Sequence, residues 1–579
     1  MSPEPESFRR RAAWAVLLAV APLAAYSSAF ENGFIGEDRR GIVDNRLIRS
    51  LGNIPDLFRH HTSWSGGSRA AAVQRSTDTY RPIPAALVFL EYAIAGPAPF
   101  FFHASSVLFH IANVFLLVFV ATGLGLRKSS ARLAALIFAV HPAIAEAIHL
   151  INACSDPLAL FFFLSAVALW QRKRSAGLIS GAAVAVLFFC ATLCKETAFL
   201  VATVVLFLVR GWHARPRHAL MSLVPWIVGG ACGLMARWAV LGGSGVSATE
   251  SDWVYSLYRV PLIWLDAVRS FLIPVSEIQV NLLEAYRDPA AATVVAAAAL
   301  SASFLVAAVI AVRHRFALGL AILWVFCVTM APVALLTRHA SWFGWGRYLY
   351  LSAPFVSLGI AVLVFEVVVP KVTQRLRPFA LAAGVAVLLF LALQTFWAGR
   401  AFRSDRAFAE AAIADHPDIS VGYANLGEIE INDGNHSRGL SLAEKAISLD
   451  PRSGRNWSLA ASALMHLGRF PEAYRAAERA IAAGVEDGRA AYIIAIRHLS
   501  ERRDTSAARI LLDVISDDPE KKGPWGTLRR ALASRGRNSE FARVVRERLE
   551  TPALLPLAPA IRAMLAGAPE SPTEIPLNR

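Results

Sequence analysis

The chain is poor in charge and in cysteine. Only 17% of its 579 residues are charged, whereas 55% are hydrophobic, a balance that favours a protein with several membrane spans over a soluble domain. All five cysteines lie in the apolar first two-thirds, which excludes a disulfide framework in the polar C-terminal third. The net charge is +15, but the sequence has no long basic arm and no basic patch interleaved with aromatic residues, so we expect no nucleic-acid partner.

Long apolar runs predict an all-α, polytopic helix bundle with about eleven membrane spans. Two further runs, 82–96 and 256–274, are short or interrupted by charge and proline, and we expect them at the membrane interface. The predicted spans are 12–30, 104–126, 131–150, 154–170, 176–193, 197–210, 220–241, 291–312, 316–337, 347–369 and 378–397.

Short basic connections predict the topology of this bundle. If the arginines at 9–11 are cytoplasmic, every short basic connection falls on the cytoplasmic side, as the positive-inside rule requires. Making just one of the two doubtful runs a full span breaks this agreement. We therefore predict the N-terminus inside, and a first outer loop with interfacial helices at 31–103. Everything after about residue 398, including the C-terminus, is predicted outside.

The C-terminal third is polar, alanine-rich and periodic. Tyr423 and Trp457 begin two similar segments 34 residues apart, and a proline, Pro451, stands near the end of the first. A 34-residue period with a large residue near the start of each unit is typical of tetratricopeptide repeats, whose helical hairpins stack into an α-solenoid with a concave groove. Small residues also recur at this spacing: Gly439, Ala473 and Ala507.

Five groups of ionisable residues lie within or beside the predicted spans. Charge in such places is costly, so these residues are functional candidates. The predicted topology puts all five groups on the outer side, although the basic loops do not require this, and one site at the outer membrane boundary is therefore expected. The groups are Glu37 and Asp38, His141 and Glu146, Asp156, Lys195 and Glu196, and Arg347 with Tyr348.

Each group also has a structural interpretation. The acidic pair could end a helix in water, and His141 could cap one. Lys195 and Glu196 could form an interfacial ion pair with each other, which would contribute little stability. Arg347 could anchor a span by reaching to the interface. Because all five groups share one face, we favour function for the set.

Several stretches occur in an order that resembles a known family. They are "EDRRGIVDNRLI", "YRPIPAALVFLEY", "FAVHPAIAEAI", "ATLCKETAFL" and "RYLYLS", followed by the repeats. Together they resemble the transmembrane and tetratricopeptide-repeat (TMTC-like) O-mannosyltransferase family and its bacterial relatives, within the GT-C glycosyltransferase superfamily. We therefore expect a GT-C-like transmembrane domain at 1–398, a tetratricopeptide-repeat domain at 399–565 and a disordered tail at 566–579.

The resemblance implies transfer of mannose or another hexose from a polyprenyl-phosphate donor to an acceptor hydroxyl at the outer membrane face. In GT-C enzymes an acidic residue of the first outer loop is the usual catalytic candidate, which carries over here to Asp38 or its neighbour Glu37. Relatives usually have an arginine shortly before the acid that matches Asp156, and Cys154 stands in that place here. If that arginine contacts phosphate, this chain must use another cation.

The residue types suit this chemistry, because a base must activate the acceptor and cations must stabilise the departing phosphate. We predict Asp38 as the base, and a single displacement that inverts the anomeric centre. A divalent cation such as Mg²⁺ or Mn²⁺ stays an open alternative, since two adjacent carboxylates are too few ligands to predict one. The remaining roles are support or metal binding by Glu37, phosphate binding by Arg347, Lys195 and His141, and support by Glu146, Asp156, Glu196 and Tyr348.

The main alternative is a non-catalytic, membrane-anchored repeat scaffold for envelope glycan assembly, which the cysteine at 154 favours. A transporter is disfavoured because no half-chain repeat is visible and the polar residues gather at one edge of the bundle. The alanine- and arginine-rich composition indicates a bacterial inner-membrane protein with a periplasmic repeat domain. The repeat groove would then present a protein or glycan acceptor.

Overall fold

Helices account for all regular structure in the described part of the chain, which confirms the all-α prediction. Two units can be distinguished: one reaches Ala411 and the other begins at Ala412. The computed structural model describes residues 7–61, 79–172, 178–202, 216–242, 259–275, 293–296, 298–299, 302, 346–485, 488–517, 522–536, 538–551 and 553–566.

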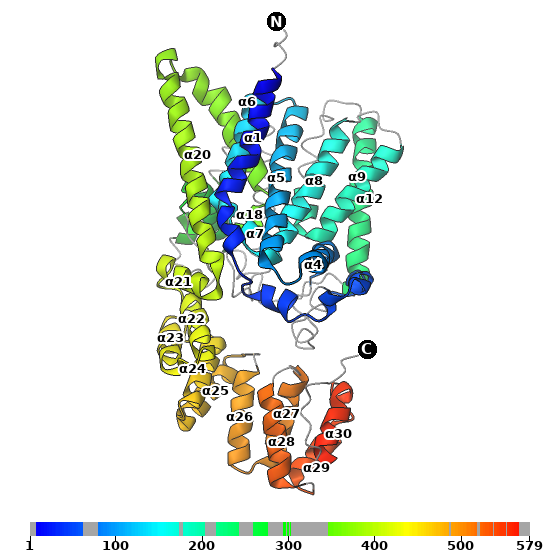
Figure 1. Cartoon of the computed structure of the whole chain (residues 1–579), viewed down its shortest axis with the longest axis vertical. Coiled ribbons are helices and arrows are strands. Elements are labelled where there is room, and N and C mark those ends of the chain that lie inside the picture. Colours follow the sequence, from blue (N-terminus) through cyan, green and yellow to red (C-terminus); the bar gives the residue numbers. More distant parts are fainter. Residues whose placement is uncertain are drawn as a thin grey trace. The chain divides into compact units, whose positions relative to one another are not determined.

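Several helices of the first unit pack side by side into the bundle of Figure 1. In the described part of the chain, four helical stretches are long and apolar enough to cross a membrane: Pro99–Gly123, Ile151–Arg172, Ser222–Leu241 and Gln374–Arg403. Such helices indicate a multi-pass membrane protein. The bundle helices are α1 (Phe8–Ala25), α5 (Pro99–Gly123), α6 (Lys128–Val140), α8 (Ser155–Arg172), α9 (Leu178–Cys194), α12 (Pro216–Leu241) and α20 (Arg377–Arg400).

The predicted span 131–150 is wrong. Helix α6 ends at Val140, because Pro142 excludes helical backbone at the residue before it, and His141 is extended with φ −80° and ψ 124°. A string of short helical turns follows: η7 (Pro142–Ile144), α7 (Glu146–His149) and η8 (Ile151–Cys154). This break turns the chain across the end of the bundle and brings Glu146 and Asn152 there.

The predicted span 347–369 is also interrupted. It contains α18 (Gly346–Leu349) and α19 (Ala353–Leu363), with a turn between them, and the helix changes to π geometry at Val364–Val368. Of the predicted span 197–210, α10 (Thr197–Val201) is described. The predicted spans 291–312 and 316–337 lie almost wholly outside the described residues, and so does the predicted tail.

The two runs expected at the interface form short helices. Helix α4 (Pro82–Ala95) has 14 residues and would reach only about 21 Å at 1.5 Å per residue, too short to cross a bilayer. Helix α14 (Arg259–Leu272) is amphipathic and buries one side, including Leu262, Ile263 and Phe271. Their lengths agree with the expectation that neither run spans the membrane.

The second unit is a succession of helices in which neighbours pair as hairpins (Figure 1). Small residues let the paired helices approach closely: a side chain at Gly439 would press on Ile431 and the backbone of Gly427. Helix α21 (Asp405–Asp415) contains the division between the units. The helices that follow are α22 (Ser420–Asn432), α23 (His436–Leu449), α24 (Gly454–His466), α25 (Phe470–Ala482), α26 (Arg489–Ser500), α27 (Asp504–Asp517), α28 (Lys522–Arg535), α29 (Glu540–Arg548) and α30 (Ala558–Ala566).

Specific contacts in this unit recur with the 34-residue period. The Tyr423 hydroxyl donates to the carbonyl oxygen of Pro417 at 3.2 Å, and one period later Trp457 Nε1 donates to that of Pro451 at 2.8 Å. Both aromatic rings are covered by cations that are also one period apart, Lys445 and Arg479. These contacts support the repeat interpretation, and the tetratricopeptide assignment stays a prediction.

Helix α20 approaches the end of the bundle at Gly399. A Cβ atom there would collide with the ring of His149 and the hydroxyl of Ser28, both of which are buried. We expect Gly399→Ala to destabilise the protein by about 1–3 kcal/mol through overpacking. The measurement is the thermal unfolding of the full chain in detergent.

Gly384 on the same helix is a matched control, because nothing lies within 4 Å of the Cβ it would gain. Gly384→Ala should leave stability unchanged or raise it by about 0.5–1 kcal/mol, since alanine is the better helix former. Equal unfolding temperatures for the two variants would contradict the close approach.

Candidate functional site

The acidic pair follows α1 and the short turn η1 (Ser27–Glu31). Asp38 is only 2% exposed, and its Oδ1 accepts the backbone N–H of Asn152 at 2.9 Å while Oδ2 accepts that of Ile35 at 3.4 Å. Glu37 is exposed, and its Oε2 accepts the side-chain amide of Asn152 at 3.1 Å. Asn152 therefore ties both acids to the segment that leads into α8. Nothing in the sequence distinguishes this asparagine, and sequence analysis missed it.

The surroundings of Asp38 favour its protonated form. Burial raises the pKa of Asp38 to about 7, and the neighbouring charge of Glu37 acts in the same direction. The N–H groups of Asn152 and Ile35 favour the carboxylate and oppose this shift only in part. A carboxyl group with a pKa near neutrality suits a general base better than an ordinary, always ionised aspartate.

A buried ion pair lies deeper in the bundle. Lys195, just after α9, donates from Nζ to Oδ1 of Asp156 in the first turn of α8, and the two side chains are 2% and 1% exposed. The same ammonium lies 4.7 Å from the ring centre of Tyr348. Lys195 and Glu196 do not pair with each other, so that structural interpretation is wrong.

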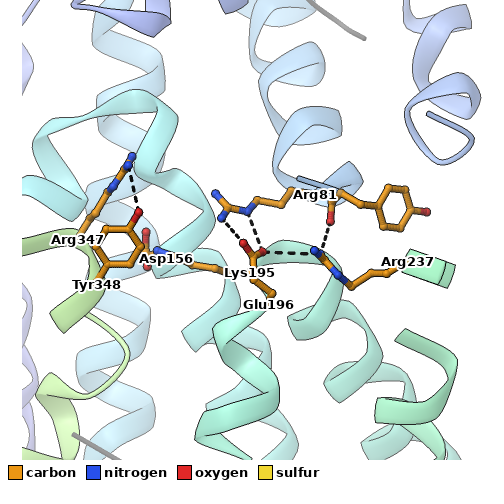
Figure 2. Close-up of polar contacts among 8 residues, drawn as sticks. Arg81, Asp156, Lys195, Glu196, Arg237, Arg347 and Tyr348 are labelled. Atoms are coloured by element: carbon orange, nitrogen blue, oxygen red, sulfur yellow. Dashed lines mark hydrogen bonds and ion pairs between the residues drawn. The ribbon is translucent and has the colours of Figure 1, made fainter. Parts of the chain in front are cut away.

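Glu196 is held by two arginines that sequence analysis did not select (Figure 2). Arg81 donates from Nε and Nη2 to its carboxylate at 3.1 and 2.6 Å, and Arg237 Nη1 lies 3.7 Å from the same group. Arg237 Nη1 also donates to the carbonyl oxygen of Tyr80 at 2.9 Å. Burial alone would raise the pKa of Glu196, but the two guanidinium groups hold it below its usual range.

Arg347 and Tyr348 come from α18. The backbone N–H of Arg347 donates to Oε2 of Glu146 at 3.3 Å, and its guanidinium donates to the Tyr348 hydroxyl at 3.4 Å while lying 5.1 Å from the ring centre. The charges of Glu37, Glu146 and Asp156 all act on this guanidinium. Arg347 therefore links the acidic pair to the buried ion pair.

His141 is placed differently from the other candidates. Its Nδ1 accepts the N–H of Ala143 at 3.2 Å, and its Nε2 lies 3.2 Å from the carbonyl oxygen of Phe271 in α14. These contacts suit a neutral ring with a proton on Nε2. In the described part of the chain, no hydrogen bond or ion pair joins His141 to the other predicted site residues. The remaining candidates gather around Arg347 and the Lys195–Asp156 pair.

The described residues do not fit a metal ion. Among them no group of three or more histidine, cysteine, aspartate or glutamate side chains is arranged to hold one. Glu37 and Asp38 provide two carboxylates, and both oxygens of Asp38 face N–H groups. The chemistry below is therefore derived from the side chains alone.

The chain is similar to curated protein O-mannosyl-transferases over part of its length. It is 29% identical to human TMTC1 over 199 residues, which are 32% of this chain and 22% of the relative. It is 30% identical to mouse TMTC3 over 193 residues, 32% of this chain and 20% of the relative, and 30% identical to mouse TMTC4 over 180 residues, 28% and 24% of the two chains. These relatives confirm the resemblance to the TMTC-like family. The match spans about a fifth to a quarter of their length.

No protein-family model matches the chain. Among solved structures, it is similar to the Archaeoglobus fulgidus oligosaccharyltransferase, with a TM-score of 0.36 and 12% identity over 70% of this chain and 57% of that one. It is also similar to ArnT from Cupriavidus metallidurans, with a TM-score of 0.34 and 14% identity over 80% of each chain. At these scores no conclusion about the present chain follows from either likeness.

The Lys195–Asp156 pair gives a test of the site's architecture. Lys195→Met leaves a buried carboxylate without its partner, and we expect a loss of about 3–5 kcal/mol of stability. The double variant Lys195→Met/Asp156→Leu should recover most of that loss, because neither charge remains. Thermal unfolding of the purified chain measures both.

The exposed pair Asp56–Arg59, with side chains 38% and 74% exposed, is the control. Arg59→Ala should change stability by no more than about 1 kcal/mol. If Lys195→Met unfolded at the same temperature as Arg59→Ala, the pair would not be the buried support described here.

Proposed function

We propose that the chain is an integral membrane glycosyltransferase of the GT-C type that moves a hexose, mannose by analogy with its relatives, from a polyprenyl-phosphate donor to an acceptor hydroxyl. The observation that carries this proposal is the placement of Asp38, a buried carboxyl group with a pKa raised to about 7, in the same cluster as the Arg347 guanidinium. A base and a phosphate-binding cation are the two groups that this reaction needs.

In this mechanism Asp38 takes the proton of the acceptor hydroxyl as its oxygen attacks the anomeric carbon. The new bond forms as the bond from that carbon to the phosphate oxygen breaks, and the electron pair leaves with the lipid phosphate. One displacement inverts the anomeric centre. Arg347 stabilises the charge that develops on the phosphate, since its planar guanidinium can donate two parallel hydrogen bonds.

The other predicted residues act mainly through their neighbours. Lys195 is bonded to Asp156 and covered by Tyr348, so it holds α8, the end of α9 and α18 together and adds positive charge near the phosphate. Glu146 fixes the backbone of Arg347. A direct phosphate contact by His141 stays a prediction, and its backbone contacts favour a role in holding α14 against the end of α6.

A site at the membrane boundary suits such a donor, because the lipid tail stays in the bilayer while the sugar meets an acceptor in water. We propose that the site faces the outer side of the bacterial inner membrane and that the repeat domain offers a protein or glycan acceptor on that side. The scaffold alternative rests on Cys154, which is 4% exposed and has no charge to offer a phosphate.

Asp38→Asn tests the enzyme directly. With radiolabelled polyprenyl-phosphate mannose and an envelope extract, we expect label transfer to fall by about 10²–10⁴-fold, since the amide cannot accept the proton. Asp44→Asn is the matched control, an exposed aspartate of the same loop, and should transfer like the wild type. Equal transfer by all three proteins would remove Asp38 as the base. No transfer by the wild type across several donor sugars would favour the scaffold.

The raised pKa of Asp38 predicts a pH profile. Below about pH 7 the carboxyl group is protonated and cannot accept a proton, so kcat/KM should fall about tenfold per pH unit and level off above pH 7. The profile is measured from about pH 5 to pH 9, with helical content followed in parallel to exclude unfolding. A rate that does not change between pH 6 and pH 8 would mean that the base has an ordinary carboxyl pKa.

A further inference from the structure

The mechanism above leaves Arg81, Glu196 and Arg237 without a role. They come from three separate places: the residue before α4, the turn after α9, and the last two turns of α12. Figure 2 shows both guanidinium groups directed at the one carboxylate between them. A single carboxylate compensates only one of the two positive charges.

The nearest charged groups do not remove this excess. Asp156 also acts on Arg81, but it is already paired with Lys195. Across the two groups, three cations face two carboxylates, which leaves one positive charge uncompensated. Excess charge in a largely enclosed site is costly unless a partner of opposite sign binds there.

This group is open to a ligand, whereas the neighbouring ion pair is not. The side chains of Arg81, Glu196 and Arg237 are 23%, 28% and 14% exposed, against 2% for Lys195. An anion can therefore reach Arg81 without breaking an existing ion pair. Arg81 also lies within electrostatic reach of Tyr348, which contacts Arg347, so the two arginine groups border one another.

The segment that follows Arg81 indicates a lipid source for the anion. Helix α4 begins at the next residue and is apolar, and its Leu90 and Ile94, one turn apart, are 45% and 81% exposed. A phosphate at Arg81 would thus have an apolar helix beside it that can accompany an acyl or prenyl chain. A free phosphate ion would have no use for such a surface.

We propose that Arg81 and Arg237, held together by Glu196, form a binding site for the phosphate ester of a lipid carrier. The inference rests on the proposed function and adds to it. The two guanidinium groups supply hydrogen bonds and the one uncompensated charge, while Arg347 acts on the side of the reacting sugar. Glu196 is a positioning residue, because it orients both arginines and touches no substrate.

Binding of undecaprenyl phosphate to the full chain, without any transfer, tests this site. Native mass spectrometry from detergent compares it with undecaprenol, which has the same chain and no phosphate. The wild type should prefer the phosphate, and Arg81→Gln and Arg237→Gln should each weaken phosphate-lipid binding at least about tenfold while leaving undecaprenol unaffected. Arg269→Gln, an arginine on α14 whose side chain is 54% exposed, is the control and should bind like the wild type.

The outcomes separate this inference from the proposed function. Wild-type binding that neither substitution weakens would overturn the Arg81–Arg237 site and leave the enzyme proposal standing. A wild type that does not distinguish undecaprenyl phosphate from undecaprenol would overturn both the site and the donor class. Inorganic phosphate that displaces the lipid at equal concentration would identify free phosphate as the ligand and reject the lipid source.

If Arg81→Gln does not fold, Arg81→Lys replaces it. The lysine keeps the charge and loses the planar pair of donors, so phosphate-lipid binding should still fall, by roughly threefold to tenfold. A tie between helices alone would predict a lower unfolding temperature for these variants with no change in the preference for phosphate over undecaprenol, and that result would overturn the site.

Discussion

The buried ion pair between Lys195 and Asp156 is the contact on which the rest of the site depends. Each charge would be prohibitively costly alone at nearly full burial, so the two can be there only together. Their pairing fixes the start of α8 against the end of α9. The adjacent residue, Glu196, is thereby presented to Arg81 and Arg237, and the Lys195 ammonium meets the ring of Tyr348.

From this pair the charges extend in two directions. Through Tyr348 and Arg347 they reach Glu146 and the acidic pair of the first loop, where a base is proposed. Through Glu196 they reach two arginines beside an apolar interfacial helix, where a lipid phosphate is proposed. The sugar to be transferred would lie between the two groups. The architecture thus separates activation of the acceptor from anchoring of the donor.

Sequence patterns predicted the class of fold well and the boundaries of helices less well. Apolar runs identified α5, α8, α12 and α20 as spans, since length and composition suffice for a helix that faces lipid. The run 131–150 failed because hydropathy is blind to Pro142, which stops the helix at the residue before it. The 34-residue period was visible because each repeat makes the same contacts with its neighbour, as Tyr423 and Trp457 do.

For the site, the sequence by itself determined which residues are exceptional: charges such as Asp38, Lys195, Glu196 and Arg347 stand out because their neighbours are apolar. Their partners were decided only by the tertiary structure. Lys195 and Glu196 are adjacent in sequence, yet their side chains leave the turn after α9 in different directions and meet Asp156 and Arg81, 39 and 115 residues away. Asn152 carries no charge and stands out in no pattern, because its importance comes entirely from the two acids that folding brings to it.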